Sequence, residues 1–241
     1  MRGMSLVVWI GLGLFVWLGW AWVSHVVVSL SVRGTLDSGA AMAFMRVYAR
    51  LVHGLVVENR ERIPEKGSGA TIVVCNHTAG VDPLLVQSAF PYEITWTMAQ
   101  DMRLAWAERF WEWSGILFVD RQGGGSSGAR KALRVLADGG VLGIFPEGRL
   151  ERPHRRLLRF HAGVGLLTIK SGARVVPVVI DGTPDCESAW GSLWRMSRAR
   201  LRVLEPIVYD EGTRPGEVVA DLQRRFVEAT GWPVVDEREE S

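Results

Sequence analysis

Beyond residue 60, the sequence alternates short apolar runs with longer segments of helical periodicity. The apolar runs predict strands at 71–75, 94–98, 116–119, 141–145, 174–180 and 201–208. The periodic segments predict helices at 83–90, 101–113, 126–138, 161–171 and 215–229. Because such alternation is typical of α/β domains, we expect a mixed, largely parallel sheet flanked by helices. Functional residues of such sheets usually lie in loops at the carboxyl ends of the strands.

Composition excludes several classes of function. The chain has 241 residues and a net charge of +2, and only three residues are lysine, so arginine supplies most of the positive charge. The planar guanidinium group suits phosphate and carboxylate ligands. The arginines are spread over many segments and do not form a stripe with aromatic residues, so we expect no nucleic-acid binding. Cys75 and Cys186 lie far apart and lack ligand spacing, which predicts neither a disulfide framework nor a metal site.

The amino-terminal segment Met4–Val32 contains no Asp, Glu, Lys or Arg. About 20 apolar residues suffice to cross a bilayer as a helix, so we expect an N-terminal membrane helix within residues 1–32. Glycines in the segment leave open a helix that lies in one leaflet. Arg33, Arg46 and Arg50 follow the segment, and the positive-inside rule therefore predicts a membrane location on the cytoplasmic face.

Three further regions follow the N-terminal segment. Residues 33–57 predict an amphipathic basic helix, residues 58–230 the main domain, and residues 231–241 a charged tail. The apolar face of the amphipathic helix would carry Phe44, Tyr48, Leu51 and Leu55, and its basic face Arg46, Arg50 and His53. A basic face beside a membrane segment suits anionic headgroups, although an ordinary solvated face explains the pattern equally well.

A histidine and a carboxylate follow the predicted strand at 71–75. His77 and Asp82 are five residues apart in the loop that leads to the next helix. Such an imidazole can take a proton from a substrate hydroxyl while the carboxylate holds its other ring nitrogen. The competing interpretation makes Asp82 an N-cap, followed by Pro83 at the first helical position, and His77 an ordinary loop residue.

Two more strand ends carry charged residues beside glycine. Asp120 and Arg121 follow the strand at 116–119, and Glu147, Gly148 and Arg149 follow the strand at 141–145. Each motif alone is weak evidence. Charged loops at three strand ends of one sheet, however, predict a common site for an anionic substrate.

The glycine-rich stretch after Arg121 permits an alternative. Gly123, Gly125 and Gly128 match the spacing of a dinucleotide fingerprint, with Glu147 near the place of a ribose-binding acid. The stretch is low in complexity and no first strand opens the domain with it. Since a nicotinamide site would also leave the histidine motif without a role, we disfavour this interpretation.

Over about residues 55–210 the chain resembles the membrane glycerolipid acyltransferases typified by bacterial 1-acylglycerol-3-phosphate (lysophosphatidate) acyltransferase. The resemblance lies in four blocks in the family's order: Asn76-His77 through Asp82-Pro83, Phe118-Val119-Asp120-Arg121, Phe145-Pro146-Glu147-Gly148-Arg149 and Val175-Val176-Pro177-Val178. It implies that the first block is catalytic and that the second and third bind the acceptor and its phosphate. The fourth, with Val176 and Pro177, would be linked to acyl-donor binding.

The resemblance implies acyl transfer from acyl-CoA or acyl carrier protein to the free hydroxyl of lysophosphatidate in phospholipid biosynthesis. No covalent acyl-enzyme and no cofactor are expected. His77 would be the general base and Asp82 would orient it. A membrane lipid and the acyl donor would be the partners of the protein.

Two departures from the family pattern concern the acceptor. The family often has Gly-Thr-Arg-Ser after the Glu, whereas here Arg149 follows Gly148 directly, and Leu150 and Glu151 come next. His161 replaces a lysine that would face phosphate, with Arg159 nearby. These differences leave open another lyso-lipid acceptor, including an aminolipid. A protein of a different class, a membrane lipid-binding protein without turnover, is the further alternative.

Overall fold

The computed structural model describes residues 6–119, 126–150, 155–186 and 188–235. The helices in these residues are α1 (Leu6–Ser29), α2 (Leu36–Leu51), α3 (Asp82–Ala89), α4 (Glu108–Ser114), α5 (Ser126–Ala137), α6 (Ala162–Ser171) and α7 (Pro215–Thr230). The strands are β1 (Val56–Glu58), β2 (Thr71–Cys75), β3 (Thr95–Ala99), β4 (Leu117–Val119), β5 (Val141–Ile144), β6 (Leu157–Leu158), β7 (Arg174–Asp181), β8 (Arg200–Val203) and β9 (Val234–Val235). Short 3-10 turns lie at Arg60–Arg62, Gln100–Met102, Ala105–Ala107 and Trp190–Trp194.

Seven of the described strands form one sheet, in the order β1-β8-β7-β2-β5-β3-β4. Neighbouring strands run parallel except for the antiparallel pair of β7 and β8. Strands β6 and β9 form a separate parallel pair. The mixed, largely parallel sheet flanked by helices is therefore confirmed. The segment 101–113, predicted as one helix, instead divides into two 3-10 turns and α4.

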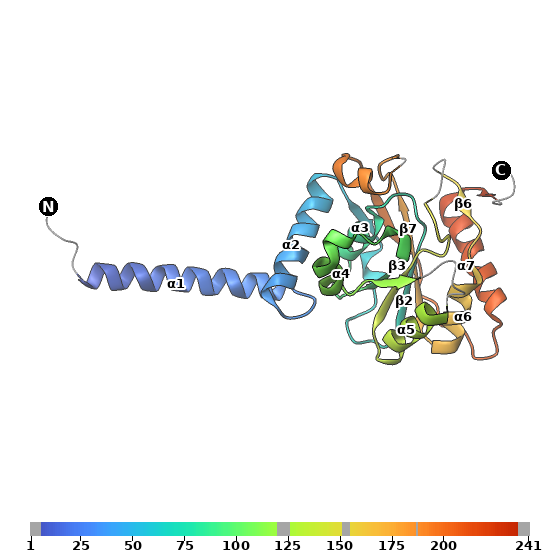
Figure 1. The fold of residues 1–241 in the computed structure, drawn as a ribbon, viewed down its shortest axis with the longest axis horizontal. Coiled ribbons are helices and arrows are strands. Elements are labelled where there is room, and N and C mark those ends of the chain that lie inside the picture. The colour runs from blue at the N-terminus through green and yellow to red at the C-terminus, as the bar shows by residue number, and fades with distance from the viewer. Residues whose placement is uncertain (1–5, 120–125, 151–154, 187, 236–241) are drawn as a thin grey trace.

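Both faces of the sheet are covered by helices, as Figure 1 shows. In β2, Val73 and Cys75 join the apolar cluster that includes residues of α3, whereas Ile72 and Val74 join the cluster that includes residues of α5, α6 and α7. Side chains of a strand point alternately to its two faces, so a strand covered on both faces is largely apolar. All five residues of β2 are buried, and four of them are Ile, Val or Cys.

Helix α1 projects from the domain and meets α2 at one end (Figure 1). Gly39 permits this close packing, since a Cβ there would lie 2.0 Å from the carbonyl oxygen of Val27. Among the described residues, no helix is long and apolar enough to cross a membrane. The N-terminal membrane helix expected within residues 1–32 stays a prediction.

The segment 33–57 also differs from the amphipathic basic helix expected there. Helix α2 ends at Leu51, and residues 56–58 join the sheet as β1. His53 is fully buried, and its Nδ1 and Nε2 lie 2.8 Å from the Ser197 hydroxyl and 2.9 Å from the Tyr48 hydroxyl. It therefore belongs to the interior and not to a basic surface. In the expected tail, 234–235 form β9, and residues 236–241 lie outside the described residues.

Candidate active site

The carboxyl end of β2 places His77 and Asp82 in contact. The Nδ1 atom of His77 lies 3.0 Å from Oδ2 of Asp82. The Asp82 side chain is fully buried, whereas the His77 side chain is 18% exposed. Asn76 fixes this end of the strand, because its side-chain amide exchanges two hydrogen bonds, of 2.9 and 2.8 Å, with the backbone of Ile180 in β7. The loop is thus anchored to two strands, and its imidazole is open to a substrate.

The Asp82 carboxylate is turned towards this loop. Its Oδ2 also accepts hydrogen bonds from the backbone N–H groups of Thr78, at 2.7 Å, and Ala79, at 2.8 Å. The N-cap residue of α3 is Val81, which makes no side-chain capping bond. The Asp82 side chain therefore contacts the His77 ring and the loop backbone and does not cap the helix. A carboxylate held in this way favours the imidazole tautomer with its proton on Nδ1, which leaves Nε2 as a proton acceptor.

Two threonines and a glycine support the loop. The hydroxyl of Thr78 lies 2.7 Å from that of Thr183, beyond β7, and donates to the Asp82 carboxylate at 3.4 Å. Gly80 allows the 189–190 segment to approach closely, since a Cβ at Gly80 would lie 2.2 Å from the carbonyl oxygen of Ala189. Sequence reasoning missed Thr183, because nothing in its local pattern indicates a partner 105 residues away.

Glu147 lies directly behind the loop. Its side chain is 1% exposed, Oε1 accepts the backbone N–H of His77 at 3.3 Å, and Oε2 accepts that of Leu158 at 3.5 Å. The pKa of the buried Cys75 thiol is well above its usual value because of burial and the nearby charges of Asp82 and Glu147. The structure thus brings both carboxylates to one end of β2. The acceptor role of Glu147 stays a prediction.

The segments at 146–149 and 159–161 lie side by side. The backbone N–H of His161 donates to the carbonyl oxygen of Pro146 at 2.8 Å. Gly148 has a φ of 70°, and a Cβ there would lie 2.9 Å from the His161 ring. Arg149 and Arg159 are both exposed. Three candidate substrate-binding residues with basic side chains therefore come from adjacent segments beside the His77 loop.

The remaining candidate residues are Asp120, Arg121, Val176 and Pro177. Asp120 and Arg121 lie outside the described residues. Val176 and Pro177 are buried in β7, where they pair with Val73 and Val74 of β2. Their link to the acyl donor stays a prediction. In the described part of the chain, no group of three or more His, Cys, Asp or Glu residues could hold a metal ion.

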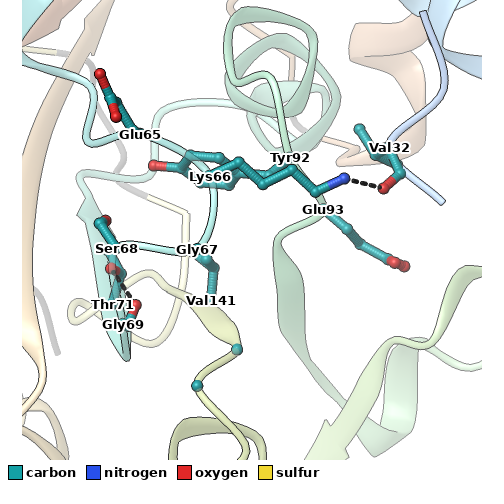
Figure 2. Close-up of a pocket in the computed structure, with 12 residues that line it drawn as sticks. Val32, Glu65, Lys66, Gly67, Ser68, Gly69, Thr71, Tyr92, Glu93 and Val141 are labelled. Atoms are coloured by element: carbon teal, nitrogen blue, oxygen red, sulfur yellow. Dashed lines mark hydrogen bonds between the residues drawn. The ribbon is translucent and has the colours of Figure 1, made fainter. Parts of the chain in front are cut away.

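A cavity of about 260 Å³ lies at the amino ends of the strands, opposite the end that carries His77. It is lined by residues that precede β2, β3 and β5, including Lys66, Tyr92 and Gly140. Figure 2 shows the Lys66 side chain reaching the carbonyl oxygen of Val32, with which it forms a 3.0 Å hydrogen bond. Burial raises the pKa of Tyr92 to about 12. Because His77 lies at the carboxyl end of β2, this cavity is separate from the candidate active site.

Comparisons with known proteins show which family the chain resembles. A sequence profile of the acyltransferase family matches residues 54–181. The chain is 30% identical to 1-acyl-sn-glycerol-3-phosphate acyltransferase of Borreliella burgdorferi, an alignment that covers 54% of this chain and 52% of the relative. It is 25% identical to the protein of that name in Bacillus subtilis, over 68% of this chain and 78% of the relative. The chain thus spans about half the length of the first relative.

A solved structure shares the fold. The crystal structure of the 1-acyl-sn-glycerophosphate (LPA) acyltransferase PlsC from Thermotoga maritima superposes with a TM-score of 0.66 and 21% identity. The superposition covers 80% of this chain and 77% of that chain. The family profile covers more than half of the present sequence and includes the His77 loop and Glu147. The chain therefore belongs to the acyltransferase family, whose members use an acyl donor as a substrate.

Proposed function

We propose that this protein transfers a fatty acyl group from acyl-CoA or acyl carrier protein to the free hydroxyl of lysophosphatidate. The contact between His77 and Asp82 carries the proposal. His77 Nε2 takes the hydroxyl proton as the oxygen attacks the thioester carbonyl, and Asp82 stabilises the resulting imidazolium. The new oxygen–carbon bond forms, the carbon–sulfur bond breaks, and the proton passes from His77 to the departing thiolate. No covalent acyl-enzyme is required.

The basic residues beside the loop support an anionic acceptor. Arg149, Arg159 and His161 come from segments that contact each other at Gly148. Guanidinium groups bind phosphate oxygens with charge-assisted hydrogen bonds, and holding the acceptor next to His77 would itself accelerate transfer. Both named bacterial relatives are 1-acyl-sn-glycerol-3-phosphate acyltransferases. Lysophosphatidate is therefore the first acceptor to test.

The proposed site of action is the cytoplasmic face of a membrane. Helix α1 exposes aromatic side chains, with Phe15 75% exposed and Trp20 68% exposed, and Phe44 of α2 is 70% exposed. Tryptophan favours the headgroup layer of a bilayer. Co-sedimentation with vesicles containing anionic lipid tests the membrane binding that this location requires, and protein that stays in the supernatant at every lipid concentration would contradict it.

The activity is tested by thiol release from acyl-CoA by purified protein in detergent, with lysophosphatidate as acceptor. We expect acceptor-dependent release that His77→Ala abolishes. Arg149→Ala should raise the KM for the acceptor, whereas Arg134→Ala should not, because Arg134 is exposed on α5 away from the loop. The same assay with other lyso-lipids and an aminolipid tests the acceptor, and repetition with acyl carrier protein tests the donor.

The lipid-binding alternative predicts a different pattern. Such a protein would bind lysophosphatidate equally well with or without the imidazole of His77 and would release no thiol from either donor. Acceptor-dependent release that survives His77→Ala would contradict the proposed role of this residue. The absence of thiol release with every acceptor and both donors would contradict the proposed activity.

A further inference from the structure

Three aromatic rings are stacked beside the candidate active site. The ring of Phe145 lies on the imidazole of His77, with centroids 4.0 Å apart and an angle of 20° between the planes. The ring of Trp96 stacks with Phe145 at a centroid distance of 5.1 Å and an angle of 16°. The rings therefore form a continuous column from the apolar core to the imidazole.

The column is built from three adjacent strands. His77 follows β2, Phe145 follows β5, and Trp96 lies in β3, and β5 pairs with both of the other strands. Trp96 is paired in register with Gly143, where a Cβ would lie 2.5 Å from the indole ring. A glycine inside a strand often marks such a close approach. The absence of a side chain at Gly143 thus lets Trp96 lie close to the sheet at this point.

Trp96 is held firmly in this place. It is 7% exposed and belongs to the same apolar cluster as Val73 and Leu85. Phe145 is partly buried and packs against that cluster. Because the core side of the column cannot move freely, the face that Phe145 presents to His77 has a fixed orientation.

We propose that Phe145, backed by Trp96, is a positioning residue for His77. The inference rests on the proposed function. The bond to Asp82 fixes one ring nitrogen of His77, but rotation about that contact would still tilt the ring. Contact with the face of Phe145 removes this freedom. The same π face attracts the imidazolium that forms as the hydroxyl loses its proton, an interaction stronger in the transition state than in the resting site.

This role makes kcat the sensitive parameter. Phe145→Leu keeps an apolar side chain of similar length but removes the ring, and should lower kcat about 10-fold, as expected for loss of one cation–π contact. The KM for the acceptor should stay within about 2-fold, since binding to the basic segments is unchanged. Phe145→Tyr keeps the ring and should restore most of kcat. Trp96→Leu should lower kcat as well, and Trp96→Phe less so.

A spectroscopic measurement tests the contact independently of turnover. An aromatic ring stacked on an imidazole shifts the carbon-bound ring protons upfield, so NMR of protein labelled at histidine should show shifted signals, assigned to His77 by their loss in His77→Ala. The shift should vanish in Phe145→Leu and persist in Phe145→Tyr. Phe90→Leu is the control, because Phe90 is fully buried in the same cluster and has no ring contact with His77.

The outcomes separate this inference from the proposed function. A lower kcat with an unchanged KM, loss of the ring-current shift and rescue by tyrosine would support the positioning role. If wild type is active and Phe145→Leu has full kcat, or if Phe90→Leu lowers kcat as much, the positioning role is overturned while the acyltransferase proposal stands. Wild type without acyl transfer in any assay would overturn both.

Discussion

The backbone N–H of His77 donates a hydrogen bond to the buried carboxylate of Glu147, at 3.3 Å. The ring of the same histidine contacts a second buried carboxylate, that of Asp82, at 3.0 Å. One acid thus holds the main chain and the other holds the imidazole. The orientation of the imidazole therefore depends on two strand ends, since Asp82 follows β2 and Glu147 follows β5.

Substitution of Glu147 tests the main-chain contact. Glu147→Ala leaves the N–H groups of His77 and Leu158 without their acceptor in a buried site, which should lower the free energy of unfolding by about 2 kcal/mol or more. Glu147→Gln retains an acceptor oxygen and should lower the free energy of unfolding by a smaller amount. Urea denaturation measures both, with Glu61→Ala, at an exposed position, as the control. Equal stability of Glu147→Ala and wild type would show that the contact is unimportant.

Substitution of Asp82 tests the orientation of the imidazole. Asp82→Asn can still accept the N–H groups of the loop, but it cannot stabilise an imidazolium, so kcat should fall about 10²- to 10⁴-fold while the protein stays folded. Asp138→Asn makes the same chemical change at an exposed position and should leave kcat unaltered. Steady-state thiol release measures both variants. A fall of less than about 3-fold in Asp82→Asn would contradict the mechanism.

The sequence was sufficient for those features that depend on local pattern. β2 occupies the predicted range, because a strand buried on both faces is a largely apolar run, and the spacing of His77 and Asp82 predicts their contact. Individual hydrogen bonds between distant segments were not predictable. The partner of the His77 main chain is a side chain 70 residues away, and short strands such as β6 have too few residues to show a period.

His53 illustrates the same limit. Its position in an amphipathic pattern indicated a basic surface, yet the ring is buried between two hydroxyl groups. Tyr48 donates its own proton to the carbonyl oxygen of Leu193, so its hydroxyl oxygen accepts from His53 Nε2, and Nδ1 lies 2.8 Å from the Ser197 hydroxyl. Burial lowers the pKa of this ring and so favours its neutral form. A partner 144 residues away makes this burial possible.

The burial of His53 predicts a dependence of stability on pH. Burial lowers its pKa below the ordinary value of 6.5, and the charge of Asp82 opposes this only in part. Between the lowered pKa and 6.5, the unfolded chain binds more protons at this histidine than the folded protein does. The free energy of unfolding therefore falls as the pH falls through that window. Urea denaturation at several pH values should show that the free energy of unfolding falls more steeply with falling pH in wild type than in His53→Gln. Parallel curves would contradict the prediction.

The close approach at Gly80 predicts that a single methyl group disturbs the site. In Gly80→Ala the new Cβ would lie 2.2 Å from the carbonyl oxygen of Ala189, so the His77 loop or the 189–190 segment must move. Overpacking of this kind lowers stability by about 1–3 kcal/mol, and displacement of the loop should lower kcat as well.

Gly191→Ala is the matched control for Gly80→Ala, because it makes the same change in the neighbouring 3-10 turn, where the nearest atoms would be 3.7 Å from the new Cβ. That is ordinary van der Waals contact, so the control should keep the stability and kcat of wild type. Urea denaturation and thiol release compare the two variants. If Gly80→Ala behaves like Gly191→Ala, the loop is free to shift without consequence, and the orientation of His77 must then depend on Asp82, Glu147 and the stacked ring alone.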